Sequence, residues 1–154
     1  MLIRRVHHTG FTVADIERSI TFYRDTLGLE LIARQVGTAE YLSTVTGFPG
    51  VRLNMAFLKV PGDDDHILEL LEYVSHPAEP TPRDTNRPGN GHLCFVVEDV
   101  QAVYRELTAK GISFRSEPAL ISAGVNKGAL AVYGRDPDGF TLEFFQPPKG
   151  LVSS

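Results

Sequence analysis

The stretch His8–Ile16, HTGFTVADI, decides the fold because the chain repeats it at residues 92–100 as HLCFVVEDV. Both stretches fit the pattern H-x-x-F-x-V-x-D-I/V without a gap. A second repeat, ILELLE from Ile67 and TLEFFQ from Thr141, places a Glu at the third position each time. The His and the Glu are 61 residues apart in the first half and 51 apart in the second. Such repeats indicate one structural unit used twice, with the extra residues expected in a loop over 37–50.

Each half predicts a strand, then a helix, then three further strands. Asp15 and Asp99 are suitable N-caps, and Gly28 and Gly111 stand where the two helices should end. Apolar runs bounded by turn residues predict seven of the strands, at 6–13, 30–36, 51–60, 66–73, 113–116, 129–134 and 140–146, and the eighth begins at the repeated His92. The last two strands should be joined by a turn at Asp136-Pro-Asp-Gly.

The predicted fold is therefore α+β, with two tandem βαβββ modules that form a curled mixed sheet, a half-barrel, around a metal site. We expect one domain over residues 1–154, made of module one at 4–74, a Pro-rich linker at 75–89 and module two at 90–147.

Composition restricts the class of protein further. The 154 residues are 42% hydrophobic and 22% charged, with a formal net charge of -4 and no basic block, so a nucleic-acid partner is not expected. No apolar run reaches the roughly 20 residues of a membrane span. The single cysteine, Cys94, cannot form an internal disulfide, which favours a reducing, cytoplasmic location.

Four of the repeated residues could bind a metal ion. His8 and His92 begin the repeats, and Glu69 and Glu143 lie inside otherwise apolar strands. If the sheets curl toward one another, two imidazoles and two carboxylates would converge, a set that suits a divalent transition metal. Taken singly, a strand His is more often a hydrogen-bonded core residue and either Glu could be a charge at the rim. A buried carboxylate is costly, however, and coordination offsets that cost.

The duplicated unit, with its H-x-x-F-x-V-x-D motif and late Leu-Glu, resembles the vicinal oxygen chelate superfamily. That superfamily includes glyoxalase I, methylmalonyl-CoA epimerase, extradiol dioxygenases and antibiotic-resistance proteins. The resemblance implies that His8, Glu69, His92 and Glu143 are the four metal ligands, as in bacterial glyoxalase I. It implies a divalent ion (Ni, Co, Mn, Fe or Zn), no organic cofactor, a small-molecule substrate and a homodimer.

Two positions depart from glyoxalase I. Thr12 stands where an Arg usually holds the glutathione carboxylate, and Tyr73 replaces an assisting Asn. These departures argue against glutathione. The implied activity is a lyase or isomerase that abstracts a proton next to a carbonyl of a substrate chelated through neighbouring oxygens. The alternatives are a methylmalonyl-CoA epimerase-like racemase and a non-catalytic small-molecule binding or resistance protein.

We expect Glu143 to carry the proton, with Glu69 as the second candidate, because a Glu that leaves the metal becomes a base beside the acidified C–H group. Arg52, Asn54 and Lys127 are candidate substrate contacts. For the two basic residues, simple solvation at the surface is the competing interpretation.

Overall fold

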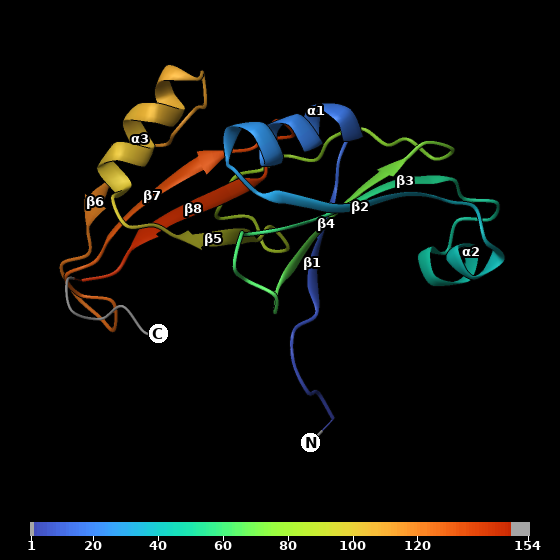
Figure 1. Ribbon diagram of the computed structural model, residues 1–154, viewed down its shortest axis with the longest axis horizontal. Coiled ribbons are helices and arrows are strands. Elements are labelled where there is room, and N and C mark those ends of the chain that lie inside the picture. Colours follow the sequence, from blue (N-terminus) through green and yellow to red (C-terminus); the bar gives the residue numbers. More distant parts are fainter. Residues whose placement is uncertain (1, 149–154) are drawn as a thin grey trace. The chain divides into compact units, whose positions relative to one another are not determined.

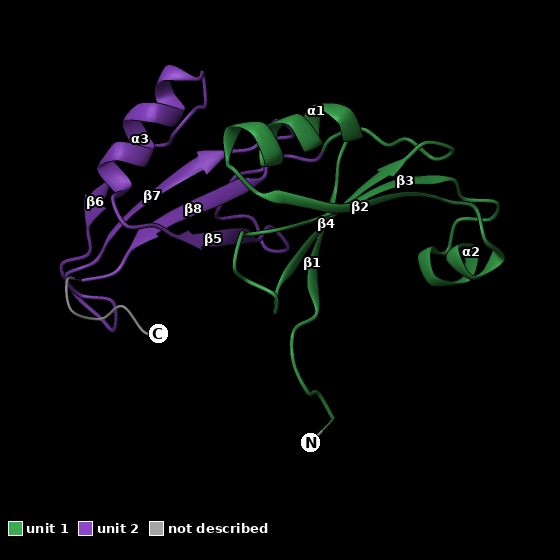
Figure 2. Cartoon of the chain, viewed as in Figure 1, with its two compact units in different colours: residues 1–80 green, residues 81–154 purple. Residues whose placement is uncertain are grey.

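The computed structural model describes residues 2–148, and the chain divides into two compact units, Met1–Pro80 and Thr81–Ser154 (Figure 2). Each unit is a small α+β module (Figure 1). Among the described residues, no helix is both long and apolar enough to cross a membrane.

The first unit contains one four-stranded sheet in the order β1-β4-β3-β2. Strands β1 and β4 are parallel, and the other two pairs are antiparallel. Its elements are β1 (His8–Thr12), α1 (Ile16–Ile20), the π-helix η1 (Thr21–Thr26), β2 (Glu30–Gly37), α2 (Glu40–Thr46), β3 (Leu53–Lys59) and β4 (Ile67–Tyr73).

The second unit has the same topology, with the order β5-β8-β7-β6. Again the first and last strands of the module are parallel and the remaining pairs antiparallel. Its elements are β5 (His92–Val96), α3 (Val100–Ala109), β6 (Ala119–Leu120), β7 (Leu130–Arg135) and β8 (Thr141–Gln146). Two mixed sheets of βαβββ type are confirmed; their curling around a metal stays a prediction.

The predicted helix starts are confirmed. The Asp15 carboxylate accepts hydrogen bonds from the backbone N–H groups of Glu17 and Arg18, and Asp99 accepts one from Ala102, each at 3.0 Å. Gly28 and Gly111 adopt positive φ angles of 82° and 86° beyond the helix ends. The first helix differs in one respect, because its second part is a π-helix in which the Leu27 N–H bonds the Phe22 carbonyl five residues earlier.

One face of each sheet packs against the module's helix. In the first unit Phe11 contacts Tyr23 from the helical segment, and Tyr23 and Leu70 have no exposed surface. In the second unit Phe144 packs on Phe95 and Phe114 on this side of the sheet. Because strand residues alternate, neighbours such as His8 and Gly10 face the other way.

We expected a loop over residues 37–50, but this region contains helix α2. Leu42 of this helix packs against Val51, Leu53 and Met55, and a Cβ at Gly37 would lie only 2.6 Å from its Cδ1 atom. Met55 and Phe57 alternate onto the face that carries Glu69, so α2 packs on that face, at its far end.

The predicted strand 113–116 is shorter than expected. The Arg115 N–H bonds the Tyr133 carbonyl and the Arg135 N–H bonds the Ser113 carbonyl, but pairing breaks there and resumes only at β6. Pro118, which has no backbone N–H, lies in the interruption.

Candidate metal centre

Strands β1 and β4 bring His8 and Glu69 together within the first unit. The parallel register sets Gly10 opposite Glu69, so that Glu69 lies one pleat beyond His8 on the same face. The His8 Nε2 atom is 3.4 Å from the Glu69 Oε2 atom. The His side chain is 45% exposed and the Glu side chain 15% exposed, so the imidazole lies at the surface and the carboxylate is mostly covered.

Strands β5 and β8 repeat this arrangement in the second unit. Cys94 stands opposite Glu143, as Gly10 stands opposite Glu69. The His92 Nε2 atom is 3.1 Å from the Glu143 Oε2 atom, with the side chains 46% and 17% exposed. The repeat therefore extends from the sequence to the placement of the two donor atoms.

Both N···O distances suit two ligands of one ion. A direct charge-assisted hydrogen bond between such groups is usually shorter, at about 2.7–2.9 Å. Two donors that each lie about 2.1 Å from a metal are about 3.0 Å apart at a right angle and about 3.4 Å apart at a tetrahedral angle. Imidazole nitrogen and carboxylate oxygen are also donors that divalent transition metals accept. The residues present thus fit such an ion.

Each unit by itself brings together two of the four candidate ligands. Within residues 2–148, no three His, Cys, Asp or Glu side chains are close enough to hold a metal ion. The predicted centre with all four ligands therefore stays a prediction.

In the first pair, the neighbours of Glu69 on the sheet are apolar, whereas His8 has a polar neighbour. Phe57 stands opposite Glu69 on β3, and a Cβ atom at Gly10 would lie 3.6 Å from the Glu69 Oε2 atom. The other ring nitrogen of His8, Nδ1, lies 2.9 Å from the Nδ1 atom of His7. Such a bond to the second ring nitrogen orients a ligating imidazole. Neighbouring residues of a strand point to opposite faces, but β1 begins only at His8, so the His7 side chain can reach the His8 ring.

The surroundings of the second pair are polar. Burial and the negative charge of Glu143 raise the pKa of the Cys94 thiol to about 11. The Glu143 carboxylate also accepts a hydrogen bond from this thiol, which acts in the same direction. Tyr133 stands opposite Glu143 on β7, and its ring lies 5.3 Å from that of His92. Burial and the Glu143 charge also raise the pKa of Tyr133. Tyr133 was not among the predicted site residues, and only the register of the β7–β8 hairpin could have revealed it.

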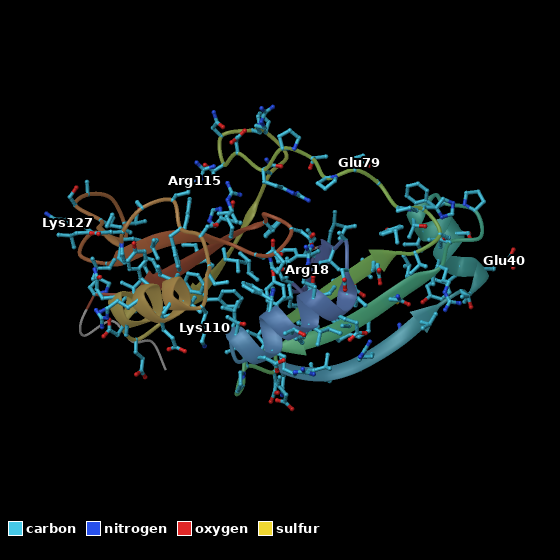
Figure 3. The ribbon with its side chains drawn as sticks, turned by 90° about the horizontal axis from the view of Figure 1, so that it is seen from above. Arg18, Glu40, Glu79, Lys110, Arg115 and Lys127 are labelled. Atoms are coloured by element: carbon cyan, nitrogen blue, oxygen red, sulfur yellow. The ribbon has the colours of Figure 1, made fainter. Side chains whose placement is uncertain are left out.

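The structure does not bring the three candidate substrate residues to either pair. Asn54 donates a hydrogen bond of 2.7 Å to the Glu72 carboxylate, on the face opposite Glu69. Arg52 is an exposed residue that precedes β3. Lys127 is exposed on the loop before β7, as Figure 3 shows.

The structure also places Thr12 and Tyr73, the two residues that depart from the glyoxalase I pattern. Thr12 is exposed at the end of β1, on the His8 face. The ring of Tyr73 packs on Phe48 with centroids 5.6 Å apart, and it borders the cluster under α2. Neither residue supplies a cation.

Comparison with known proteins identifies the family. The model of the Glyoxalase/Bleomycin resistance protein/Dioxygenase superfamily matches residues 5–144, and the chain belongs to this superfamily. It is 26% identical over 144 residues to the lactoylglutathione lyase GLX1 of Arabidopsis thaliana, covering 93% of this chain but only 44% of that protein. It is 29% identical to a 2-epi-5-epi-valiolone epimerase of an Actinomyces species, covering 94% of this chain and 80% of the relative.

Solved structures agree on the fold. A glyoxalase family protein from Bacillus cereus superposes with a TM-score of 0.81 and 22% identity, and the match covers 95% of both chains.

Proposed function

We propose that this chain is a divalent-metal-dependent lyase or isomerase that removes a proton next to a carbonyl group. The observation that carries the proposal is the duplicated His–Glu pair, with N···O distances of 3.4 and 3.1 Å at the same register of both sheets. A single pair of this kind is a common surface contact. Two equivalent pairs in one chain favour a role as metal ligands, in a centre that forms either within one chain or across a dimer.

His8, Glu69, His92 and Glu143 would hold the ion, and their nitrogen and oxygen donors suit Ni, Co, Mn, Fe or Zn. When bound, a divalent ion supplies a Lewis acid that stabilises negative charge on a substrate oxygen. The chain's own residues must then remove the proton, orient the substrate and exclude water.

Glu143 is our candidate for the base. Its carboxylate is 17% exposed and lies next to the Cys94 thiol and the Tyr133 ring, two groups that can hold it in place without neutralising it. Glu69 is the second candidate, and its neighbours Gly10 and Phe57 offer no side-chain donor. Because the surroundings differ, the two carboxylates should contribute unequally to turnover.

The proposed substrate is not a glutathione adduct. Thr12 and Tyr73 provide no cation for the glutathione carboxylate. An epimerase is the second candidate function, favoured by the relative from Actinomyces that is 29% identical to this chain. Lyases, isomerases and epimerases of this kind all remove a proton from the carbon next to a carbonyl group, and this proton removal is the step we propose.

Solvent-deuterium exchange at the carbon next to a carbonyl tests the step directly. We expect the wild-type protein to exchange deuterium into a 2-hydroxy ketone or 2-oxo aldehyde adduct and the Glu143→Gln variant to lose at least about two orders of magnitude, the usual contribution of a catalytic base. Glu79→Gln, a change in the exposed residue labelled in Figure 3, is the matched control and should behave as wild type.

Full exchange in the Glu143→Gln variant would remove Glu143 from this role. Binding of such compounds without exchange in the wild type would instead favour a non-catalytic binding protein.

We also propose that the chain functions as a homodimer. Several strand residues are apolar yet exposed, and such side chains are suited to cover by a second copy: Ile32 at 48%, Val36 at 55% and Val96 at 72%. Light scattering coupled to gel filtration should give twice the chain mass, and the mass of one chain would contradict this. The cytoplasmic location stays a prediction.

A further inference from the structure

The second unit gathers arginines beside the face that carries Glu143. Four of them lie around two Asp residues, although the whole chain has a formal net charge of -4. The set consists of Arg83, Arg87, Arg115 and Arg135, with Asp84 and Asp136. This group of side chains therefore carries a net positive charge, whereas the whole chain carries a net negative charge.

Asp84 is mostly engaged by one of these arginines. Its Oδ2 atom lies 3.0 Å from the Nε atom of Arg87, whereas its Oδ1 atom is 3.8 Å from the Arg115 Nη2 atom. Arg115 is 45% exposed, and this distance is too long for a hydrogen bond. Figure 3 shows the labelled Arg115 side chain. Most of the five N–H donors of a guanidinium thus remain available at Arg115.

Arg135 and Arg83 have unused donors as well. One nitrogen of Arg135, Nη1, donates to the Gly139 carbonyl at 2.6 Å and the Thr141 hydroxyl at 2.8 Å, which fixes the side chain on the sheet. The Arg83 Nε atom is buried and, among the described residues, has no hydrogen-bond partner. Its guanidinium lies 5.9 Å from the centre of the Phe140 ring. A buried donor without an acceptor is costly, so an acceptor from a ligand would offset that cost.

The arginines also act on one another. Burial and the charges of Arg115 and Arg83 lower the pKa of Arg135, while Asp84 and Asp136 act in the opposite direction. Cations that destabilise a neighbouring cation attract an anion, and guanidinium groups match the planar oxygens of carboxylate and phosphate.

The strand registers place Arg135, and the bridge of Phe114 to Gly134 places Arg115, on the face of the candidate metal ligands. His92, Thr141 and Arg135 form one row across β5, β8 and β7, and Cys94, Glu143 and Tyr133 form the next row. Two strand spacings separate the backbones of His92 and Arg135, a distance of about 10 Å. The Arg115 N–H bonds the Tyr133 carbonyl, which continues the pairing beyond β7.

We propose that Arg115, Arg135 and Arg83 bind an anionic group, a carboxylate or a phosphate, of the substrate. This inference rests on the proposed function, because it makes the anion one end of a small molecule whose other end reaches the His92–Glu143 pair. It assigns the substrate to the acidic 2-oxo or 2-hydroxy carbonyl compounds.

Titration with inorganic phosphate and with acetate at low salt tests the anion site, read from the arginine Nε–H signals in nitrogen-15 NMR spectra of the whole chain. The Arg115→Gln variant should bind about tenfold to a hundredfold more weakly, the usual effect of losing a charge-assisted contact. Arg105→Gln is the matched control, since it removes the same charge from an exposed residue of α3 in the same unit. Asp84→Asn should strengthen binding, because the competing carboxylate is removed.

The titration is repeated after dialysis against a chelator, so that binding by a metal ion is excluded. A stronger response to phosphate than to acetate assigns a phosphate ester, and the reverse assigns a carboxylic acid. Equal affinity in the Arg115→Gln and Arg105→Gln variants, or no response in the wild type, overturns the anion site.

Metal content of the same samples separates the two proposals. Arg115→Gln should keep the wild-type content. Metal with no arginine response refutes only the anion site, whereas an arginine response in protein that takes up no metal refutes the proposed function on which the substrate assignment rests.

Discussion

The turn between β7 and β8 is held by one buried carboxylate, and its removal should be costly. Asp136 is 5% exposed, and its Oδ1 atom accepts hydrogen bonds from the N–H groups of Phe140 at 2.7 Å and Asp138 at 3.0 Å. The Asp136 N–H in turn donates to the Phe140 carbonyl at 3.0 Å. These contacts shape the connection that sets Tyr133 opposite Glu143.

The cost of Asp136→Ala follows from these two bonds. Hydrogen bonds to a charged group contribute about 1.5–3 kcal/mol each, so their loss sets an upper range of about 3–6 kcal/mol. The variant also removes the desolvation cost of the carboxylate, and water can reach the half-buried N–H groups. We therefore expect a loss of about 3 kcal/mol in the free energy of unfolding. Asp136→Asn keeps an acceptor oxygen and should cost about 1 kcal/mol.

Urea unfolding followed by far-UV circular dichroism measures both variants, since the chain has no Trp to report by fluorescence. With a slope of about 2 kcal/mol per M, the Ala variant should unfold at about 1.5 M less urea than wild type. A difference below about 0.5 kcal/mol, the range of ordinary surface substitutions, would refute the reasoning. Equal losses in the Ala and Asn variants would show that charge, not the accepted hydrogen bonds, holds the turn.

Four further substitutions test other parts of the structure. His7→Ala should weaken metal binding about tenfold in a competition with a chromogenic chelator, because the bond that orients His8 is lost; unchanged affinity would exclude this role. Leu70→Ala, at a side chain with 0% exposure, should cost about 2–5 kcal/mol in urea unfolding. Leu120→Ala, at 64% exposure, should cost under about 0.5 kcal/mol, and similar losses at both sites would contradict the described core. Gly139→Ala should lower the free energy of unfolding by about 1–2 kcal/mol because φ is 78° there, and a stable variant would show that the turn tolerates a side chain.

The repeated elements could be predicted because local chemistry specifies them. Asp15 and Asp99 cap helices in both modules, and the strands that carry His8 and His92 follow from the repeated motif and its apolar residues. Each of these features depends on residues within a few positions of one another.

Helix α2 could not be predicted, because tertiary packing stabilises it. Its sequence EYLSTVT contains β-branched residues and Ser, and Ala39 at its N-cap provides no side-chain hydrogen bond. Leu42 is the residue that fixes it, through contacts with Val51, Leu53 and Met55. None of these contacts is visible as a helical repeat in the sequence.

The neighbours of Glu143 could not be predicted either, because they depend on the exact register between β7 and β8. The expected turn ends at Gly139, whereas in the structure the strands pair only from Arg135 and Thr141 outward. One residue of slippage reverses which side chains share a face, so Tyr133 could not be placed beside Glu143.

The metal content of purified protein tests the central claim most directly. We expect about one divalent ion per chain in protein prepared without chelator, measured by plasma mass spectrometry. His8→Ala and His92→Ala should each lose most of it, because each removes a ligand from a different unit. His76→Ala, a change outside both pairs at a residue whose ring nitrogen bonds Ser75, should keep it. No metal in the wild type, with none taken up from Ni, Co, Mn, Fe or Zn, or equal content in all four proteins, would contradict the account.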